Sequence, residues 1–211
     1  MDLFTAKDFK VFGIPAFQER MDAIRRAIRP KLTSIGEALA PRVSAAVDRP
    51  LFVHVAKHAR RTVNPPDDTW AAMGCNSRGY KMDVHFKVAV SRHCVRLLFE
   101  AGPEYYDKTA WARAWSGEYA TLAKGLKGLS WFKNEHDEEP EAEWVSIPDK
   151  RHLGQELIRR RDGQFVVGRR IDVKEWVAMN PQVFEKVAVE TFTALSPLFT
   201  LCDTRVIARG E

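Results

Sequence analysis

Basic and histidine side chains are concentrated in one part of the chain, between His54 and Arg96. This segment holds eight Lys or Arg residues, three Asp or Glu residues and four of the six histidines. Arginine offers a planar fork of N–H donors to phosphate or carboxylate, lysine a mobile positive charge, and histidine a proton that titrates near neutrality. Together these residue types indicate a site for an anion.

The basic residues of this segment form two groups. The first follows an apolar run and precedes Pro65 and Pro66, which stiffen the chain and reduce the entropy lost when polar groups are held in place. The second lies at a turn predicted over residues 76–79 and in the strand after it. The candidate ligand-binding residues are His54, Lys57, His58, Arg60, Arg61, Asn64, Trp70, Arg78, Tyr80, Lys81 and His85.

Phosphate, a nucleotide or a phosphorylated metabolite is the expected ligand of these residues. No catalytic residue is assigned, because no nucleophile elbow or Walker pattern accompanies them, and whether the protein is an enzyme is left open. No cofactor is indicated either. A metal site is disfavoured: His54 and His58 have the spacing of helical ligands, with His85 as a third, but the predicted strand breaks that geometry and the surroundings are cationic.

Two alternatives to an anion pocket stay open. The basic residues form a solvated edge with satisfied histidines, as charge runs commonly do, or they bind nucleic acid or another protein. A further basic patch at Arg159–Arg161 with Arg169 and Arg170 suits nucleic acid, but these arginines at a predicted helix end also suit the helix dipole. No RNP-like strand pair or helix-turn-helix is evident.

Alternating strands are the elements that must position the two basic groups. Residues 51–55, 70–75, 80–90 and 94–101 predict an antiparallel meander, in which strands adjacent in sequence lie side by side. In residues 80–90 one face carries Val84, Phe86, Val88 and Val90, and the other Asp83, His85, Lys87 and Ala89. If strands 51–55 and 70–75 neighbour strand 80–90, the basic groups converge.

Helical periodicity and capping signals surround this meander. They predict helices over residues 5–13, 15–30, 32–43 with a bend at Pro41, 103–128, 150–161, 173–179 and 181–201, with further strands over 130–133, 144–147 and 164–171. The class is therefore α+β: an antiparallel sheet packed with N-terminal, central and C-terminal helices in a single domain over residues 1–211. The segment Glu135–Glu143, with six acids and no Lys or Arg, is expected to be a solvated loop.

Composition is that of an ordinary globular protein, with 45% hydrophobic residues and a formal net charge of +5. No run of about 18 apolar residues and no basic stretch followed by an apolar one is present, so a cytoplasmic protein without a membrane segment is expected. Cys75, Cys94 and Cys202 are too widely spaced for a zinc pattern and are expected to be small buried hydrophobes in a reducing compartment.

The basic segment also resembles a known family. The run HVAKHARRTVNPPDDTWAA, followed by RGYK and HF, is similar to the YktB-like family of uncharacterised bacterial proteins, as are IRPKLTSIGEALAP near the start and NPQVFEKV near the end. The resemblance implies a single α+β domain and assigns no activity. It is weakest over residues 130–162. The matching positions are His54, Lys57, His58, Arg60, Arg61, Asn64, Pro65, Trp70, Arg78, Gly79, Tyr80, Lys81 and His85.

Overall fold

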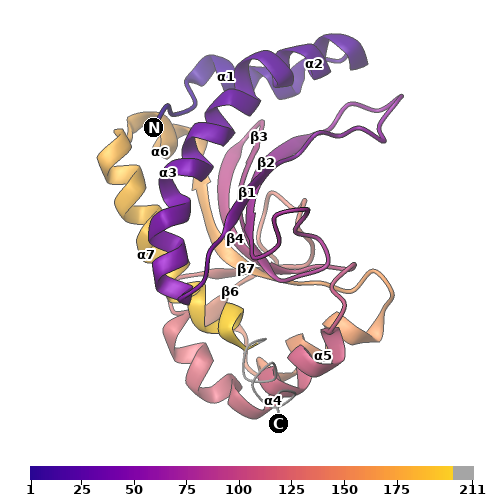
Figure 1. Cartoon of the computed structure of the whole chain (residues 1–211), viewed down its shortest axis with the longest axis vertical. Coiled ribbons are helices and arrows are strands. Elements are labelled where there is room, and N and C mark those ends of the chain that lie inside the picture. Colours follow the sequence, from indigo (N-terminus) through magenta and orange to yellow (C-terminus); the bar gives the residue numbers. More distant parts are fainter. Residues whose placement is uncertain (202–211) are drawn as a thin grey trace.

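A seven-stranded antiparallel sheet forms the centre of the protein in a computed structural model, which describes residues 1–201 (Figure 1). The strand order is β1-β2-β3-β4-β7-β5-β6, so the first four strands form the predicted meander and β7 joins its far side. The strands are β1 (Phe52–Val55), β2 (Asp68–Gly74), β3 (His85–Ser91), β4 (Cys94–Ala101), β5 (Ser130–Phe132), β6 (Ala142–Glu143) and β7 (Phe165–Asp172).

Helices cover one face of this sheet. The helices of the described residues are α1 (Ala6–Lys10), α2 (Phe17–Ala23), α3 (Arg29–Val47), α4 (Lys108–Gly125), α5 (Arg151–Arg159), α6 (Val173–Ala178) and α7 (Pro181–Thr200). Figure 1 shows α3 and α7 along one side of the sheet, with α4 and α5 at its lower end. Long loops lie on the other side. This arrangement confirms the α+β class with N-terminal, central and C-terminal helices.

The main hydrophobic core lies between the helices and this face. Apolar side chains at alternate positions of β3 and β4, such as Phe86, Val88 and Leu97, are fully buried against it. Trp111 and Trp115 of α4 stack with their ring planes 3° apart and join the same core. The strands alternate as predicted, so their other residues point to the opposite, loop-covered face.

The long N-terminal helical segment differs from the prediction in how it passes Pro30. A π-helical turn over Ile24–Ile28 joins α2 to α3, and Pro30 lies in the first turn of α3, directly after this wider turn. Pro41 lies inside α3, as predicted. Thr5 and Asp8 form the capping box at the start of α1.

Two predicted strands need correction. Residues 80–84 are not part of β3, because a turn in which the Asp83 amide donates to the Tyr80 carbonyl (3.1 Å) folds this piece back over the sheet. Trp144–Ser146 is a short 3₁₀ helix, and the strand there is Ala142–Glu143. Both segments lie where the chain turns, and alternation over a few residues does not separate a strand from a turn.

No helix within residues 1–201 is long and apolar enough to cross a membrane. Cys94 is buried as expected, and Cys75 is partly buried against the core. Cys202 lies outside the described residues.

Candidate functional site

Charged side chains are buried on the loop-covered face of the sheet, called the polar face below. Its central residues are Asp68 and Trp70 of β2, His85 and Lys87 of β3, and Arg96 and Glu100 of β4; Trp70 is 8% exposed and the five charged or titratable residues at most 5%. They occupy alternate positions of three neighbouring strands, so the pleat of the sheet points them all to one side. Burying so many charges requires partners of opposite sign.

Glu100 is the centre of the first group of partners. Its Oε2 atom lies 2.6 Å from Nζ of Lys87 and 3.2 Å from Nε2 of His85. Lys87 also pairs with Glu135, which comes from the loop over residues 133–141. Burial alone would raise the pKa of Glu100, but the nearby Lys87 and His85 outweigh it and hold that pKa well below its usual range. Glu100 is therefore a permanent anion.

Asp68 and Arg96 form the second group. The Arg96 guanidinium donates to Oδ2 of Asp68 at 2.6 Å, and His136 lies 3.1 Å from Oδ1. Burial raises the pKa of Asp68, and the hydrogen bonds and charges of His136 and Arg96 more than reverse this, so that pKa is lowered. The Nη1 group of Arg96 donates to the main-chain carbonyls of Glu135 (2.8 Å) and Asp137 (2.7 Å).

Aromatic rings connect the two groups. The ammonium of Lys87 lies 4.4 Å from the ring centre of Trp70, a cation–π contact. The Trp70 indole N–H donates to the Tyr80 hydroxyl at 2.8 Å, and the ring of Tyr80 lies 4.7 Å from that of His85. Burial raises the pKa of Tyr80 to about 12, so its hydroxyl stays protonated.

His58 adopts an unusual backbone conformation at the edge of this face. Its φ of 51° lies in the left-handed region, which is uncommon for a residue with a Cβ. The imidazole Nε2 lies 2.9 Å from the Thr69 hydroxyl, and the ring packs edge-on against Trp70. Burial, outweighing the attraction of Asp68, lowers the pKa of His58 to about 4, so the ring is neutral at pH 7.

A surface cavity lies beside this network, between the end of β1 and the loop that joins β2 to β3. Its volume is about 560 Å³, and we call it the edge cavity. The His54 ring donates to the Asn76 carbonyl at 2.8 Å, and the rings of His54 and Tyr80 lie 5.7 Å apart. The residues lining it are His54, Val55, Ala56, Lys57, Asn76, Arg78, Gly79, Tyr80, Lys81 and Met82.

The lining of the edge cavity is one-sided in charge. It contains three cationic side chains, and no Asp or Glu of the described chain lines it. Lys81 pairs with Glu104 at 3.1 Å, outside the cavity. Lys57 and Arg78 have no side-chain ion pair with any residue between 1 and 201. The cavity therefore presents two uncompensated positive charges.

The structure thus divides the eleven predicted site residues into three sets. His54, Lys57, Arg78, Tyr80 and Lys81 line the edge cavity together. His58, Trp70 and His85 belong to the network on or beside the polar face. The third set is exposed and lines neither: Arg60, Arg61 and Asn64. Among residues 1–201 no three His, Cys, Asp or Glu side chains are placed to hold a metal ion.

Sequence reasoning missed most of the buried partners. Arg96 and Glu100 lie four residues apart on one face of β4, whose other face carries Val95, Leu97 and Phe99, and two charges within so apolar a strand were the available signal. Glu135 and His136 gave no such signal, because their contacts depend on the path of a loop.

The acidic segment is not the solvated loop that its composition indicates. The loop over residues 133–141, called the acidic loop below, lies against the polar face. The Glu135 side chain is only 14% exposed. Its carboxylates and carbonyls give Lys87, Arg96 and Arg170 partners in addition to those that the sheet provides, and these contacts explain why so acidic a segment is partly buried.

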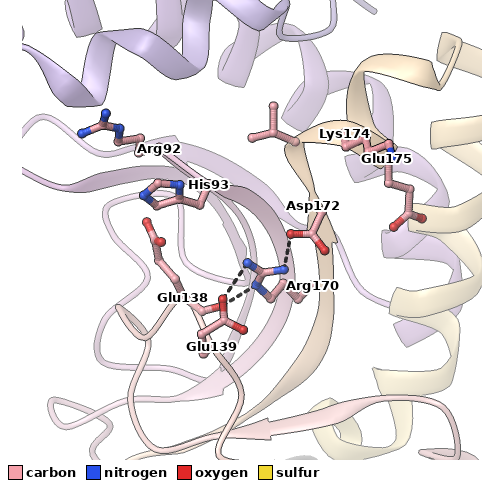
Figure 2. A pocket seen from close by; sticks show the side chains of 9 residues that line it. Arg92, His93, Glu138, Glu139, Arg170, Asp172, Lys174 and Glu175 are labelled. Atoms are coloured by element: carbon pink, nitrogen blue, oxygen red, sulfur yellow. Dashed lines mark hydrogen bonds and ion pairs between the residues drawn. The ribbon is translucent and has the colours of Figure 1, made fainter.

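A larger cavity, of about 970 Å³, lies on the far side of the acidic loop (Figure 2). Figure 2 shows Arg170 at its floor, donating to the Glu138 carbonyl, Glu139 and Asp172. Its lining mixes both signs of charge, with four acids beside Arg92, Arg170 and Lys174. Because carboxylates and a carbonyl already pair with its central arginine, this cavity is less suited to bind an anion than the edge cavity is.

Comparison with known proteins matches nearly the whole chain to one family. The family model described as a domain of unknown function, DUF1054, matches residues 4–199. A UPF0637 protein of Oceanobacillus iheyensis is 35% identical over 209 residues, which cover 97% of this chain and 99% of the relative. A UPF0637 protein of Bacillus mycoides is 33% identical over 205 residues, covering 96% and 99%.

Proposed function

Because the chain belongs to the DUF1054 family, whose description assigns no activity, we propose a function from the geometry: the protein binds a small anion in the edge cavity. The ligand class is phosphate, a nucleotide or a phosphorylated metabolite. One observation carries the proposal, namely that Lys57 and Arg78 face a cavity lined by no carboxylate of residues 1–201.

The contrast with the rest of the sheet supports this reading. Lys87, Arg96 and Arg170 each have a carboxylate within ion-pairing distance. Lys57 and Arg78 lack one, although two like charges that share a concave surface repel each other. A bound anion would remove that repulsion and occupy the fork of donors that arginine provides.

Size and lining suit a compact ligand. A volume of about 560 Å³ lies within the usual range for small-molecule sites. The rings of His54 and Tyr80 and the side chain of Met82 give the cavity an apolar wall beside its cations. A phosphate group with an attached ring or carbon chain would contact both parts.

Isothermal titration with inorganic phosphate, adenosine monophosphate and adenosine triphosphate tests the proposal. We expect Arg78→Ala and Lys57→Ala each to weaken binding about tenfold or more, because each removes a charge-assisted contact. Arg60→Ala is the matched control: Arg60 is exposed on the same segment but lies outside the lining, so its loss should change affinity less than twofold.

A nucleic-acid surface would give a different result. Titration with short oligonucleotides at increasing salt would then show an affinity that falls steeply, because many counterions are released. Arg60→Ala would also weaken binding as much as Arg78→Ala does. Either outcome contradicts the small-anion pocket, and so does the absence of binding by all three phosphate compounds.

A further inference from the structure

A second, much smaller cavity lies on the inner side of Tyr80. Its volume is about 20 Å³, and Tyr80 and Lys81 line both this inner cavity and the edge cavity. The other residues of the inner cavity are His85, Glu100, Gly102, Pro103, Glu104 and Glu135. Tyr80 therefore forms the wall between the surface cavity and the buried ion pairs of the polar face.

Glu135 fills the space on the inner side of this wall. Its carboxylate pairs with Lys87, and its Oε1 atom lies 3.7 Å from Nε2 of His136. Lys87 already has Glu100 at 2.6 Å, so one ammonium serves two buried carboxylates. The charge of Lys87 does not require Glu135, and the second carboxylate is the one that another anion could replace.

The backbone of Glu135 is held independently of its side chain. Its amide donates to Oε1 of Gln164 at 2.9 Å, and its carbonyl accepts from Arg96 at 2.8 Å. Removing the carboxylate therefore leaves the acidic loop anchored and the Lys87 ammonium in place. A space the size of a carboxylate would then remain beside the positively charged Lys87 ammonium.

We propose that Lys87, together with His136, forms a carboxylate-binding subsite that Glu135 fills in this structure. The second part of the inference rests on the proposed function: the ligand of the edge cavity carries a carboxylate group, which takes the place of Glu135 when Tyr80 moves aside. The ligand class is then a phosphorylated carboxylic acid, with its phosphate on Lys57 and Arg78.

Chemical rescue tests the subsite directly. Glu135→Ala should lower the melting temperature, and sodium acetate should restore most of the loss with saturation in the range of about 1–100 mM, since so small a ligand has few atoms for binding. Acetamide, which has the same shape without the charge, should restore none of it. Glu139→Ala is the matched control, because Glu139 belongs to the same loop but pairs with Arg170 at the surface.

The outcomes separate the two proposals. If acetamide restores stability as well as acetate, or if acetate stabilises the parent and the Glu139→Ala variant as much as it stabilises the Glu135→Ala variant, there is no carboxylate subsite. If rescue occurs but Arg78→Ala leaves phosphate binding unchanged, the subsite stands and the edge cavity is not the anion site.

The ligand class has its own test. In the parent protein 3-phosphoglycerate should bind about tenfold more tightly than glycerol 3-phosphate, which lacks the carboxylate. Glu135→Ala should increase the affinity for 3-phosphoglycerate alone. Equal affinities for the two compounds in both proteins would overturn the assignment of a carboxylate to the ligand.

Discussion

His58 combines a strained backbone with a neutral side chain, and each property has a local cause. The left-handed conformation lets the chain leave β1 and place the imidazole against Thr69 and Trp70. The same burial lowers the pKa of the ring to about 4. Backbone strain of this kind persists where the surrounding contacts fix the conformation.

This shift predicts a pH dependence of stability. The unfolded histidine gains a proton near pH 6.5 and the folded one only near pH 4, so the unfolded state binds more protons between these values. The free energy of unfolding should therefore fall as the pH is lowered from about 6.5 to 4, by up to about 3 kcal/mol, and should not change further through this group below pH 4.

Urea denaturation of the parent and of His58→Gln across this pH range measures the effect. The difference in unfolding free energy between them should change between pH 6.5 and 4 and be constant above pH 7.5. A difference independent of pH would show that His58 titrates normally. A nuclear magnetic resonance titration of the His58 ring gives its pKa directly.

At the scale of elements, β7 shows how closely two strands approach. Gly168 lies opposite Leu98 of β4 and Ser130 of β5. A Cβ added at Gly168 would lie 2.0 Å from the Leu97 carbonyl oxygen, which belongs to the backbone and cannot move without disturbing the sheet. Glycine is required here by space.

Gly168→Ala should therefore destabilise the protein by about 2–4 kcal/mol, since overpacking against backbone forces the strands apart. Gly117→Ala is the matched control, because nothing lies within 4 Å of its added Cβ and it occupies an exposed position in α4. That change should be neutral or stabilise by about 0.5–1 kcal/mol. Thermal denaturation measures the change in stability that each substitution causes. Equal changes for the two substitutions would contradict the steric argument.

Most elements could be predicted from periodicity, and the exceptions have one explanation. The meander and the C-terminal helix were predictable because their apolar residues repeat with a clear period of two or of 3.6. The turn at Tyr80–Asp83 was not, since its hydrogen bond and the contact of Tyr80 with Trp70 involve residues brought together only by the fold. Of the predicted basic groups, His54 lies on β1 and His85 on β3, whereas Lys57, Arg78 and Lys81 lie in the loops that follow β1 and β2. The pairing of Lys87 with Glu100 and Glu135 depends on contacts that only the fold creates.

For the molecule as a whole, the two faces of the sheet are stabilised by different interactions. One face is packed by helices and apolar side chains, and the other is covered by the acidic loop through ion pairs and hydrogen bonds. Arg96 is the main anchor of that loop. It joins Asp68 of the sheet to two main-chain carbonyls of the loop.

Arg96→Met should cost about 3–5 kcal/mol of stability, because it leaves Asp68 buried with only His136 as a partner. Amides of residues 135–141 should exchange with solvent faster. Arg160→Met, which breaks an exposed pair with Asp162, should change stability far less than Arg96→Met does. Urea denaturation and hydrogen exchange measure both, and unchanged exchange in the loop would show that other contacts hold it.

The way the acidic loop is held also bears on how its sequence can change. Arg96 and Arg170 donate hydrogen bonds to the main-chain carbonyls of Glu135, Asp137 and Glu138, and every amino acid supplies such a carbonyl. Such anchoring depends on the path and length of the chain, not on the identity of residues 138–141; the Asp137 side chain, by contrast, accepts hydrogen bonds from Asn134. Substitutions at residues 138–141 should accumulate among relatives while the acidic loop still covers the polar face. Inserting or deleting one residue, by contrast, would move the carbonyls away from the two arginines and expose the polar face.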